Sequence, residues 1–368
     1  MPKIRVLVVD DSVLSRRMIS DALAPDPGIE VVGTAADGKI ALAKIAHLAP
    51  DLVILDVEMP EMDGLQTLKA IRKDYPKLPV IMFSALTARD SAESLDALAL
   101  GANDYATKPA ATGGLAAAME QIRGELAPKI KSLCRRIPEI TSCPVPRKPA
   151  TGGSGSGPMD ILAIGVSTGG PNALEALLHG LMANFPVPVV IVQHMPPFFT
   201  RLLAERLSAS SGFRGREGEA GALLQPGDLW IAPGGSHMAV EKAADGVRLR
   251  IHDEPPENSC RPAVDVLFRS IAKVYGARSL SVVLTGMGQD GLVGCQFIRE
   301  AGGTILVQDE ATSIVWGMPG AVFQAGLADK MLPLNELADE INQRFETSRS
   351  RPRVAMTPKP LGALVKAL

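Results

Sequence analysis

Short apolar runs alternate with amphipathic segments along most of this chain, and this alternation restricts the possible fold more than any other feature. In the first 128 residues the strand-like runs are Ile4–Val9, Glu30–Thr34, Leu52–Leu55, Val80–Phe83 and Asp104–Tyr105. Strands that alternate with helices predict a parallel sheet covered by helices on both faces. The sequence therefore predicts an α/β domain with a five-stranded parallel sheet. Its predicted helices are Ser15–Leu23, Gly38–His47, Gly64–Lys73, Asp90–Ala99 and Gly114–Leu126.

The same alternation returns after residue 158 and predicts a second, doubly wound α/β domain. Between residues 214 and 251 the strand-like runs follow one another closely, so we expect a β-hairpin insertion there. The predicted strands are Asp160–Gly165, Val187–Gln193, Asp228–Ala232, Ala239–Lys242, Val247–Ile251, Ser279–Leu284 and Thr304–Val307. The predicted helices are Asn172–Met182, Phe198–Ser208, Pro262–Tyr275, Gly291–Ala301, Pro319–Ala325 and Asn335–Phe345.

Composition separates the two domains. Residues 138–158 are rich in proline, glycine and serine and cannot build a core, which indicates a linker. We therefore divide the chain into a domain at 1–128, a linker at 129–158, a domain at 159–347 and a disordered tail at 348–368.

The overall charge and the termini exclude several classes of protein. A formal net charge of −2 gives no basic field for nucleic acid. No apolar run is long enough to cross a membrane, and the N-terminal run Ile4–Val9 is too short for a secretory signal. The four cysteines have no metal-binding spacing. We expect a cytoplasmic, monomeric protein that neither inserts into membranes nor binds nucleic acid.

Polar residues follow the strands of the first domain at one edge. Asp10 and Asp11 end the first strand, Asp56 ends the third, Ser84 ends the fourth and Lys108 follows the fifth. Because parallel strands end at the same edge, we expect these groups to lie together. Converging carboxylates repel one another unless a hard cation such as Mg²⁺ is bound, and a lysine beside them suits a phosphoryl group.

Residues 1–126 resemble a response-regulator receiver domain through these groups and through Met59-Pro60, Asp63-Gly64 and Lys108-Pro109. The resemblance implies that Asp56 is the phosphoacceptor and that Asp10, Asp11 and Asp56 hold Mg²⁺. It also implies a flavodoxin-like fold, contact of Lys108 with the phosphoryl group, and Ser84 and Tyr105 as switch residues. In such a site Mg²⁺ and the lysine neutralise the charge of the transferring group while the aspartate attacks.

One stretch of the second domain, Gly165-Val166-Ser167-Thr168-Gly169, leads from a buried strand into a helix. It fits the G-x-S-x-G pattern in which small residues permit a tight nucleophile turn. A serine that only caps the following helix fits this short motif equally well.

A nucleophilic serine needs a base and an acid, and other strand ends supply candidates. His194 follows the run 187–193 at the same predicted edge, while His237 lies in a glycine-rich loop and is the rival base. Asp290 follows the run 279–284, although a helix N-cap is the likelier role of that residue when it is taken alone.

Together, the segments around Ser167, Gln193-His194-Met195 and Thr285–Gly291 resemble the chemotaxis protein-glutamate methylesterase family, which joins this domain to a receiver. The resemblance implies Ser167 as nucleophile, His194 as general base and Asp290 as the residue that orients the imidazole. We expect backbone amides near Thr168 or Met287 to form the oxyanion hole. His237 and Trp316 are expected to be structural.

The implied function is hydrolysis of glutamate methyl esters on chemoreceptors, activated by phosphorylation of Asp56 by a chemotaxis-type histidine kinase. Deamidation of receptor glutamines is compatible with the same acyl chemistry, and the esterase reaction is expected to need no cofactor. The rival interpretation is a response regulator whose second domain is a binding module, for example for DNA.

Overall fold

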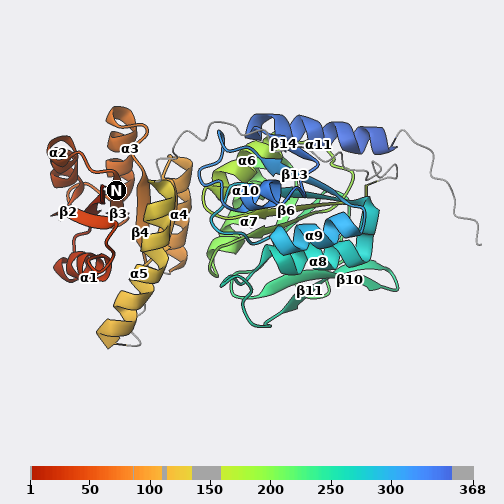
Figure 1. The fold of residues 1–368 in the computed structure, drawn as a ribbon, viewed down its shortest axis with the longest axis horizontal. Helices are drawn as coiled ribbons and strands as arrows, with labels where there is room; N and C mark the ends of the chain where they lie inside the picture. The colour runs from red at the N-terminus through yellow and green to blue at the C-terminus, as the bar shows by residue number, and fades with distance from the viewer. Residues whose placement is uncertain (1, 86, 110–113, 135–158, 350–368) are drawn as a thin grey trace, which may run out of the picture.

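The computed structural model describes residues 2–85, 87–109, 114–134 and 159–349, which form two α/β domains (Figure 1). Most of the predicted linker and of the predicted tail lies outside these residues. Among the described residues, no helix is long and apolar enough to cross a membrane.

The first domain is a five-stranded parallel sheet with the strand order β2-β1-β3-β4-β5, which confirms the predicted fold. Side chains of α1 and α5 cover one face of the sheet, and those of α2, α3 and α4 cover the other. The elements are β1 (Ile4–Val9), α1 (Val13–Leu23), β2 (Ile29–Ala35), α2 (Gly38–Leu48), β3 (Leu52–Asp56), α3 (Gly64–Asp74), β4 (Val80–Ser84), α4 (Ala88–Ala99), β5 (Asp104–Thr107) and α5 (Gly114–Leu133).

Helix α5 is longer than the sequence predicts and continues beyond the expected domain boundary at residue 128. Leu126, Ala127 and Ile130 are all buried, so the apolar face of the helix extends past Pro128. The prediction ended the helix too early because proline normally disfavours a helix interior.

The second domain is built on a seven-stranded sheet with the order β14-β13-β12-β6-β7-β9-β8. Helices α8, α9 and α10 pack on one face, and α6, α7 and α11 pack on the other. The elements are β6 (Ile161–Val166), α6 (Gly170–Gly180), β7 (Val189–Gln193), α7 (Phe199–Ser211), β8 (Arg214–Glu217), β9 (Asp228–Ile231), β10 (His237–Ala243), β11 (Gly246–His252), α8 (Val264–Tyr275), β12 (Ser279–Val283), α9 (Leu292–Glu300), β13 (Thr304–Gln308), α10 (Met318–Gln324), β14 (Lys330–Leu332) and α11 (Leu334–Arg349).

The expected hairpin insertion is only partly correct. Strands β10 and β11 form an antiparallel hairpin, but β8 and β9 join the main sheet as parallel strands. All four residues of β9 are buried, and this strand continues the sheet beyond β7. The short edge strands β8 and β14 were not predicted from the sequence.

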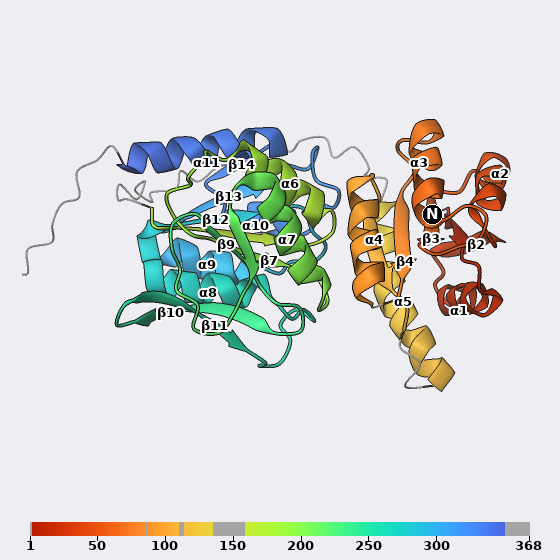
Figure 2. The ribbon, with the colours of Figure 1, turned by 180° about the vertical axis from the view of Figure 1, so that it is seen from behind.

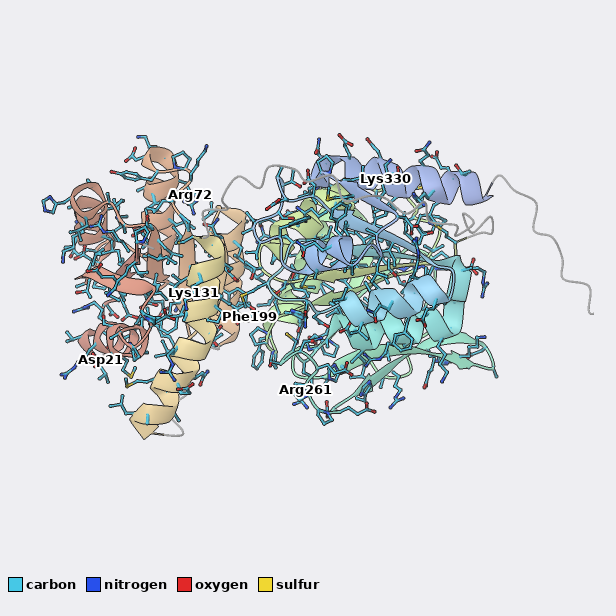
Figure 3. All side chains as sticks on the ribbon, in the orientation of Figure 1. Asp21, Arg72, Lys131, Phe199, Arg261 and Lys330 are labelled. Carbon is cyan, nitrogen blue, oxygen red and sulfur yellow. The ribbon has the colours of Figure 1, made fainter. Side chains whose placement is uncertain are left out.

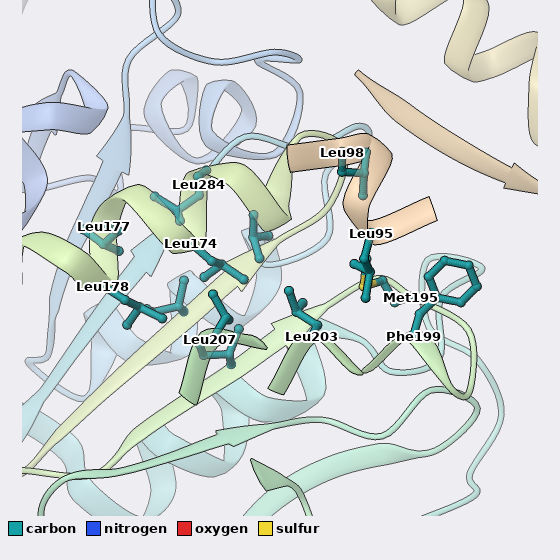
Figure 4. Packing of buried hydrophobic residues seen from close by; sticks show 14 of the residues in the cluster. Leu95, Leu98, Leu174, Leu177, Leu178, Met195, Phe199, Leu203, Leu207 and Leu284 are labelled. Carbon is teal, nitrogen blue, oxygen red and sulfur yellow. The ribbon is translucent and has the colours of Figure 1, made fainter. Parts of the chain in front are cut away.

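The two domains pack against each other through α4 of the first and α6 and α7 of the second (Figure 2). Side chains of β5 also contact the second domain. One apolar cluster runs across this boundary. In it Leu95 of α4 lies close to Met195, and Leu98, Phe199 and Leu203 belong to the same cluster (Figure 4). The contact places the receiver beside the strand ends that carry the candidate catalytic residues.

Candidate active site and phosphorylation site

Three neighbouring strands carry the candidate catalytic residues to one edge of the second sheet. Strand β6 lies between β12 and β7 and is parallel to both. Ser167 directly follows β6, His194 directly follows β7, and Asp290 lies in the loop after β12. The chain builds outward from β6 in both directions, and such a switch point in an open α/β sheet is where ligands bind.

The turn at Ser167 depends on glycines at two positions. Gly169 has a φ of +77°, which a side chain would strain, and it is the N-cap of α6 without a side-chain cap. A Cβ at Gly170 would come within 1.8 Å of Gln193 Oε1. Ser167 therefore does not cap the helix, and its half-buried side chain lines a cavity.

Gln193, the last residue of β7, braces this turn. Its Nε2 donates to the backbone carbonyl of Ser167 at 2.9 Å and to that of His194 at 3.3 Å. One buried amide thus connects the main chains of two candidate catalytic residues, a role that the sequence analysis did not predict.

His194 and Asp290 form a direct contact, with 2.8 Å between His194 Nε2 and Asp290 Oδ2. Burial opposes ionisation of the imidazole, but the hydrogen bond to Asp290, with a contribution from Cys260, raises the pKa of His194 to about 9. Burial would raise the pKa of Asp290, but His194 and the amides of Val264 and Asp265 hold that pKa below its usual value. Because Nε2 donates to the carboxylate, Nδ1 is the basic nitrogen.

The open nitrogen of His194 faces Cys260, whose Sγ lies 3.7 Å from Nδ1. Among the described residues Ser167 and His194 line one cavity without a hydrogen bond between their side chains. In enzymes without bound substrate such contacts are often long and tighten only in the complex. The thiol was missed because a single cysteine in a loop has no diagnostic spacing.

The other histidines of the second domain lie elsewhere. His237 is completely buried, with 3.1 Å between its Nε2 and the carbonyl of Pro255, while its Nδ1 accepts from the amide of Ala263. Both ring nitrogens are therefore occupied, which fits the structural role expected for it. His179 is exposed on α6, and His252 is half-buried rather than open to solvent.

Both domains line the cavity, which has a volume of about 550 Å³. Thr168 and Met287, the residues expected near an oxyanion hole, contribute to its wall. Trp316 is not among its lining residues and donates to the carbonyl of Gln308. The receiver side of the wall consists of Leu98, Asp104, Tyr105, Glu125 and Lys129.

Direct contacts join the receiver to the turn that carries Ser167. Thr168 Oγ1 donates to Asp104 Oδ2 at 2.9 Å, and both residues are buried. The ring of Tyr105 stacks on Phe199, with 4.5 Å between the centroids. Figure 3 shows Phe199 on the side of the second domain that faces the receiver. The predicted switch residue Tyr105 is thus part of the domain interface.

The acidic residues of the receiver form the cluster that the sequence predicts. Ligand oxygens of Asp10, Asp11 and Asp56 all lie within 4.8 Å of one another. Lys108 Nζ lies 2.7 Å from Asp56 and 3.0 Å from Asp10. Burial, with repulsion from Asp10, raises the pKa of Asp56 to about 6 despite Lys108. Three clustered carboxylate oxygens suit a hard divalent cation such as Mg²⁺.

Ser84 connects this site to α4. Its hydroxyl lies 2.8 Å from that of Ser94, and both are buried. Since α4 packs against α6 and α7, this hydrogen bond lies between the acidic cluster and the domain interface.

The fold and the two sites define a class: a receiver domain joined to an α/β domain with serine, histidine and aspartate at one strand edge. The family models agree. Residues 6–120 match the response regulator receiver domain, and residues 162–341 match the CheB methylesterase.

Relatives match over nearly the whole chain. A protein-glutamate methylesterase/protein-glutamine glutaminase of Trichodesmium erythraeum is 56% identical over 351 residues, covering 94% of this chain and 100% of the relative. One from a Nocardioides species is 51% identical, covering 99% of this chain and 100% of the relative. The crystal structure of the Thermotoga maritima CheB methylesterase catalytic domain is 38% identical, covers 50% of this chain and 98% of that chain, and has a TM-score of 0.49. The chain belongs to the protein-glutamate methylesterase/protein-glutamine glutaminase family.

Proposed function

We propose that this chain removes methyl groups from glutamate methyl esters of chemoreceptors, and deamidates receptor glutamines, with Ser167, His194 and Asp290 as its catalytic residues. The observation that carries the proposal is the hydrogen bond between His194 and Asp290 beside a cavity that Ser167 lines. This hydrogen bond makes His194 Nδ1, which faces Cys260 Sγ at 3.7 Å, the basic nitrogen.

In the first half of the reaction Ser167 Oγ attacks the carbonyl carbon of the ester, and its proton moves to His194 Nδ1. Asp290 remains ionised and stabilises the imidazolium. The carbon–oxygen bond to the leaving group then breaks, and His194 returns the proton so that methanol departs. Water repeats the sequence on the acyl-enzyme and releases glutamate. With a glutamine substrate the leaving group is ammonia.

The negative oxygen of each tetrahedral intermediate needs hydrogen-bond donors that are already in place. The backbone amides of Thr168 and Met287 are our candidates, because both residues line the cavity beside Ser167. The buried hydrogen bond from Thr168 Oγ1 to Asp104 ties one of these residues to the receiver.

Phosphorylation of Asp56 by a histidine kinase regulates this activity in our proposal. Asp10, Asp11 and Asp56 would hold Mg²⁺, which neutralises charge on the incoming phosphoryl group, and Lys108 would contact that group. In the unphosphorylated state the receiver forms one wall of the cavity, so it restricts access of a receptor segment to Ser167.

The test of the catalytic assignment measures methanol released from methylated receptor by the full chain. Ser167→Ala and His194→Ala should each lower the rate more than about 1,000-fold. His179→Ala is the matched control, because His179 is exposed on α6 and should leave the rate unchanged. Full activity of either catalytic variant, with the protein folded, would refute the assignment.

A further inference from the structure

Asp265 is a buried carboxylate that the proposed reaction does not use. It lies in the first turn of α8 and is only 2% exposed. Its Oδ1 accepts from the backbone amide of Gly294 at 2.6 Å, and its Oδ2 accepts from Asn258 Nδ2 at 2.9 Å. Burial of a carboxylate is costly, so its retention beside the candidate catalytic residues requires a reason.

Asn258 connects this carboxylate to Asp290. The same Nδ2 that donates to Asp265 also lies 3.0 Å from Asp290 Oδ1. An amide nitrogen carries two hydrogens, so it satisfies one oxygen of each carboxylate at once. Asn258 has a φ of +51°, a left-handed conformation that asparagine adopts more readily than most residues.

The oxygens of Asp290 have separate partners. Oδ1 accepts from Asn258 and from the amides of Asp265 and Gly291, at 3.0 to 3.1 Å. Oδ2 faces His194 Nε2 at 2.8 Å and accepts from the amide of Val264. Of the three donors to Oδ1, two are backbone amides. The third is the side chain of Asn258, which also donates to the second carboxylate, Asp265.

We propose that Asp265 and Asn258 are positioning residues for the catalytic Asp290, a proposal that rests on the proposed function. Asp265 orients the Asn258 amide, and Asn258 holds Oδ1 so that Oδ2 stays directed at His194. This arrangement keeps the proton on Nε2, so that Nδ1, which faces Cys260, is the nitrogen that accepts the proton of Ser167.

The charge of Asp265 interacts with that of Asp290, which in turn contacts the imidazole. The ionisable groups around this cluster are His194, Cys260, Asp265, Asp290, Cys295 on α9, and Arg269, which pairs with Glu257. The hydrogen bond to Asp290 raises the pKa of His194, so a variant that misaligns Asp290 should lower the pH at which His194 loses its proton.

The decisive variant is Asp265→Asn in the full chain. The side-chain nitrogen of the introduced asparagine would face a hydrogen-bond donor in either orientation, Asn258 Nδ2 in one and the Gly294 amide in the other. We expect kcat for methanol release to fall about tenfold with KM unchanged, because Asp265 does not line the cavity. We also expect the acidic midpoint of the kcat/KM profile to move to lower pH.

Asn258→Gly gives a second measurement, because Asn258 is exposed and glycine adopts its left-handed conformation without strain. If the two residues act as one unit, the double variant should have a kcat no lower than the slower single variant. Asp228→Asn is the matched control. Asp228 is a buried carboxylate at the start of β9, and its loss should change stability without moving the pH midpoint.

An unchanged kcat and midpoint in Asp265→Asn, or additive losses in the double variant, would overturn the inference while leaving the proposed function intact. A change in thermal stability alone, as expected for Asp228→Asn, would also overturn it. Absence of methanol release from the wild-type chain would instead refute the proposed function and with it this inference.

Discussion

Replacement of Asp104 by alanine should activate the unphosphorylated enzyme. Asp104 lies in β5 of the receiver, and its Oδ2 accepts a hydrogen bond from Thr168, the residue after the candidate nucleophile. The variant removes this contact without changing any residue of the catalytic domain. It should therefore weaken the packed arrangement in which the receiver lines the cavity.

The size of the effect follows from the contact that is lost. A hydrogen bond to a charged group contributes about 1.5–3 kcal/mol, which corresponds to a factor of roughly 10 to 150 in an equilibrium constant. The stacking of Tyr105 on Phe199 remains and contributes about 0.5–1.5 kcal/mol. We expect the basal rate to rise about tenfold and to stay at or below the rate of the phosphorylated wild type.

The assay compares initial rates of methanol release with and without a small-molecule phosphodonor. Asp21→Ala is the control, since Asp21 is exposed on α1 and lies away from the second domain (Figure 3). An unchanged basal rate in Asp104→Ala, with the protein folded, would refute the reasoning. A lower basal rate would mean that the receiver supports substrate binding instead of restricting it.

Three further predictions concern single groups. Asp56→Asn should not be labelled by a phosphodonor in Mg²⁺, because an amide cannot form the acyl phosphate; stoichiometric labelling would place the phosphoacceptor elsewhere. For the wild type, kcat/KM should rise between pH 6.5 and 9, because His194 must lose its proton to act as a base, and a flat profile would contradict this. Methyl methanethiosulfonate should inactivate the enzyme reversibly by modifying Cys260, 3.7 Å from His194 Nδ1, whereas treated Cys260→Ser should stay active. Loss of activity in that variant too would assign the effect to another cysteine.

The positions of both candidate sites can be predicted from the sequence, because the same rule about the ends of parallel strands applies to each. Residues that follow neighbouring parallel strands meet at one edge, so Ser167, His194 and Asp290 come together without further information. The same rule brings Asp10 and Asp56 together in the receiver. The sequence alone does not decide which of His194 and His237 is the base, because the path of the glycine-rich loop that carries His237 cannot be predicted. In the structure both ring nitrogens of the buried His237 have hydrogen-bond partners, which supports His194 as the proposed base.

The supporting residues could not be predicted in this way. Asn258 and Cys260 lie in a loop between β11 and α8, where no periodicity relates a residue to its neighbours in space. The contact between Thr168 and Asp104 joins separate domains, and no local pattern records it. Such contacts depend on tertiary packing, and the alternation of strands and helices does not predict how loops and domains pack against one another.

The arrangement of the receiver explains how a charge at Asp56 would affect Ser167. In this structure Lys108 is held by Asp10 and Asp56, and the Ser84 hydroxyl is held by Ser94 of α4. A phosphoryl group on Asp56 adds acceptor oxygens that compete for both groups. If Ser84 turns toward them, α4 loses its hydrogen bond just where it packs against the second domain. The shift is limited to the difference in contact energy between the packed and released states, so weak contacts at this boundary make the enzyme more responsive to phosphorylation.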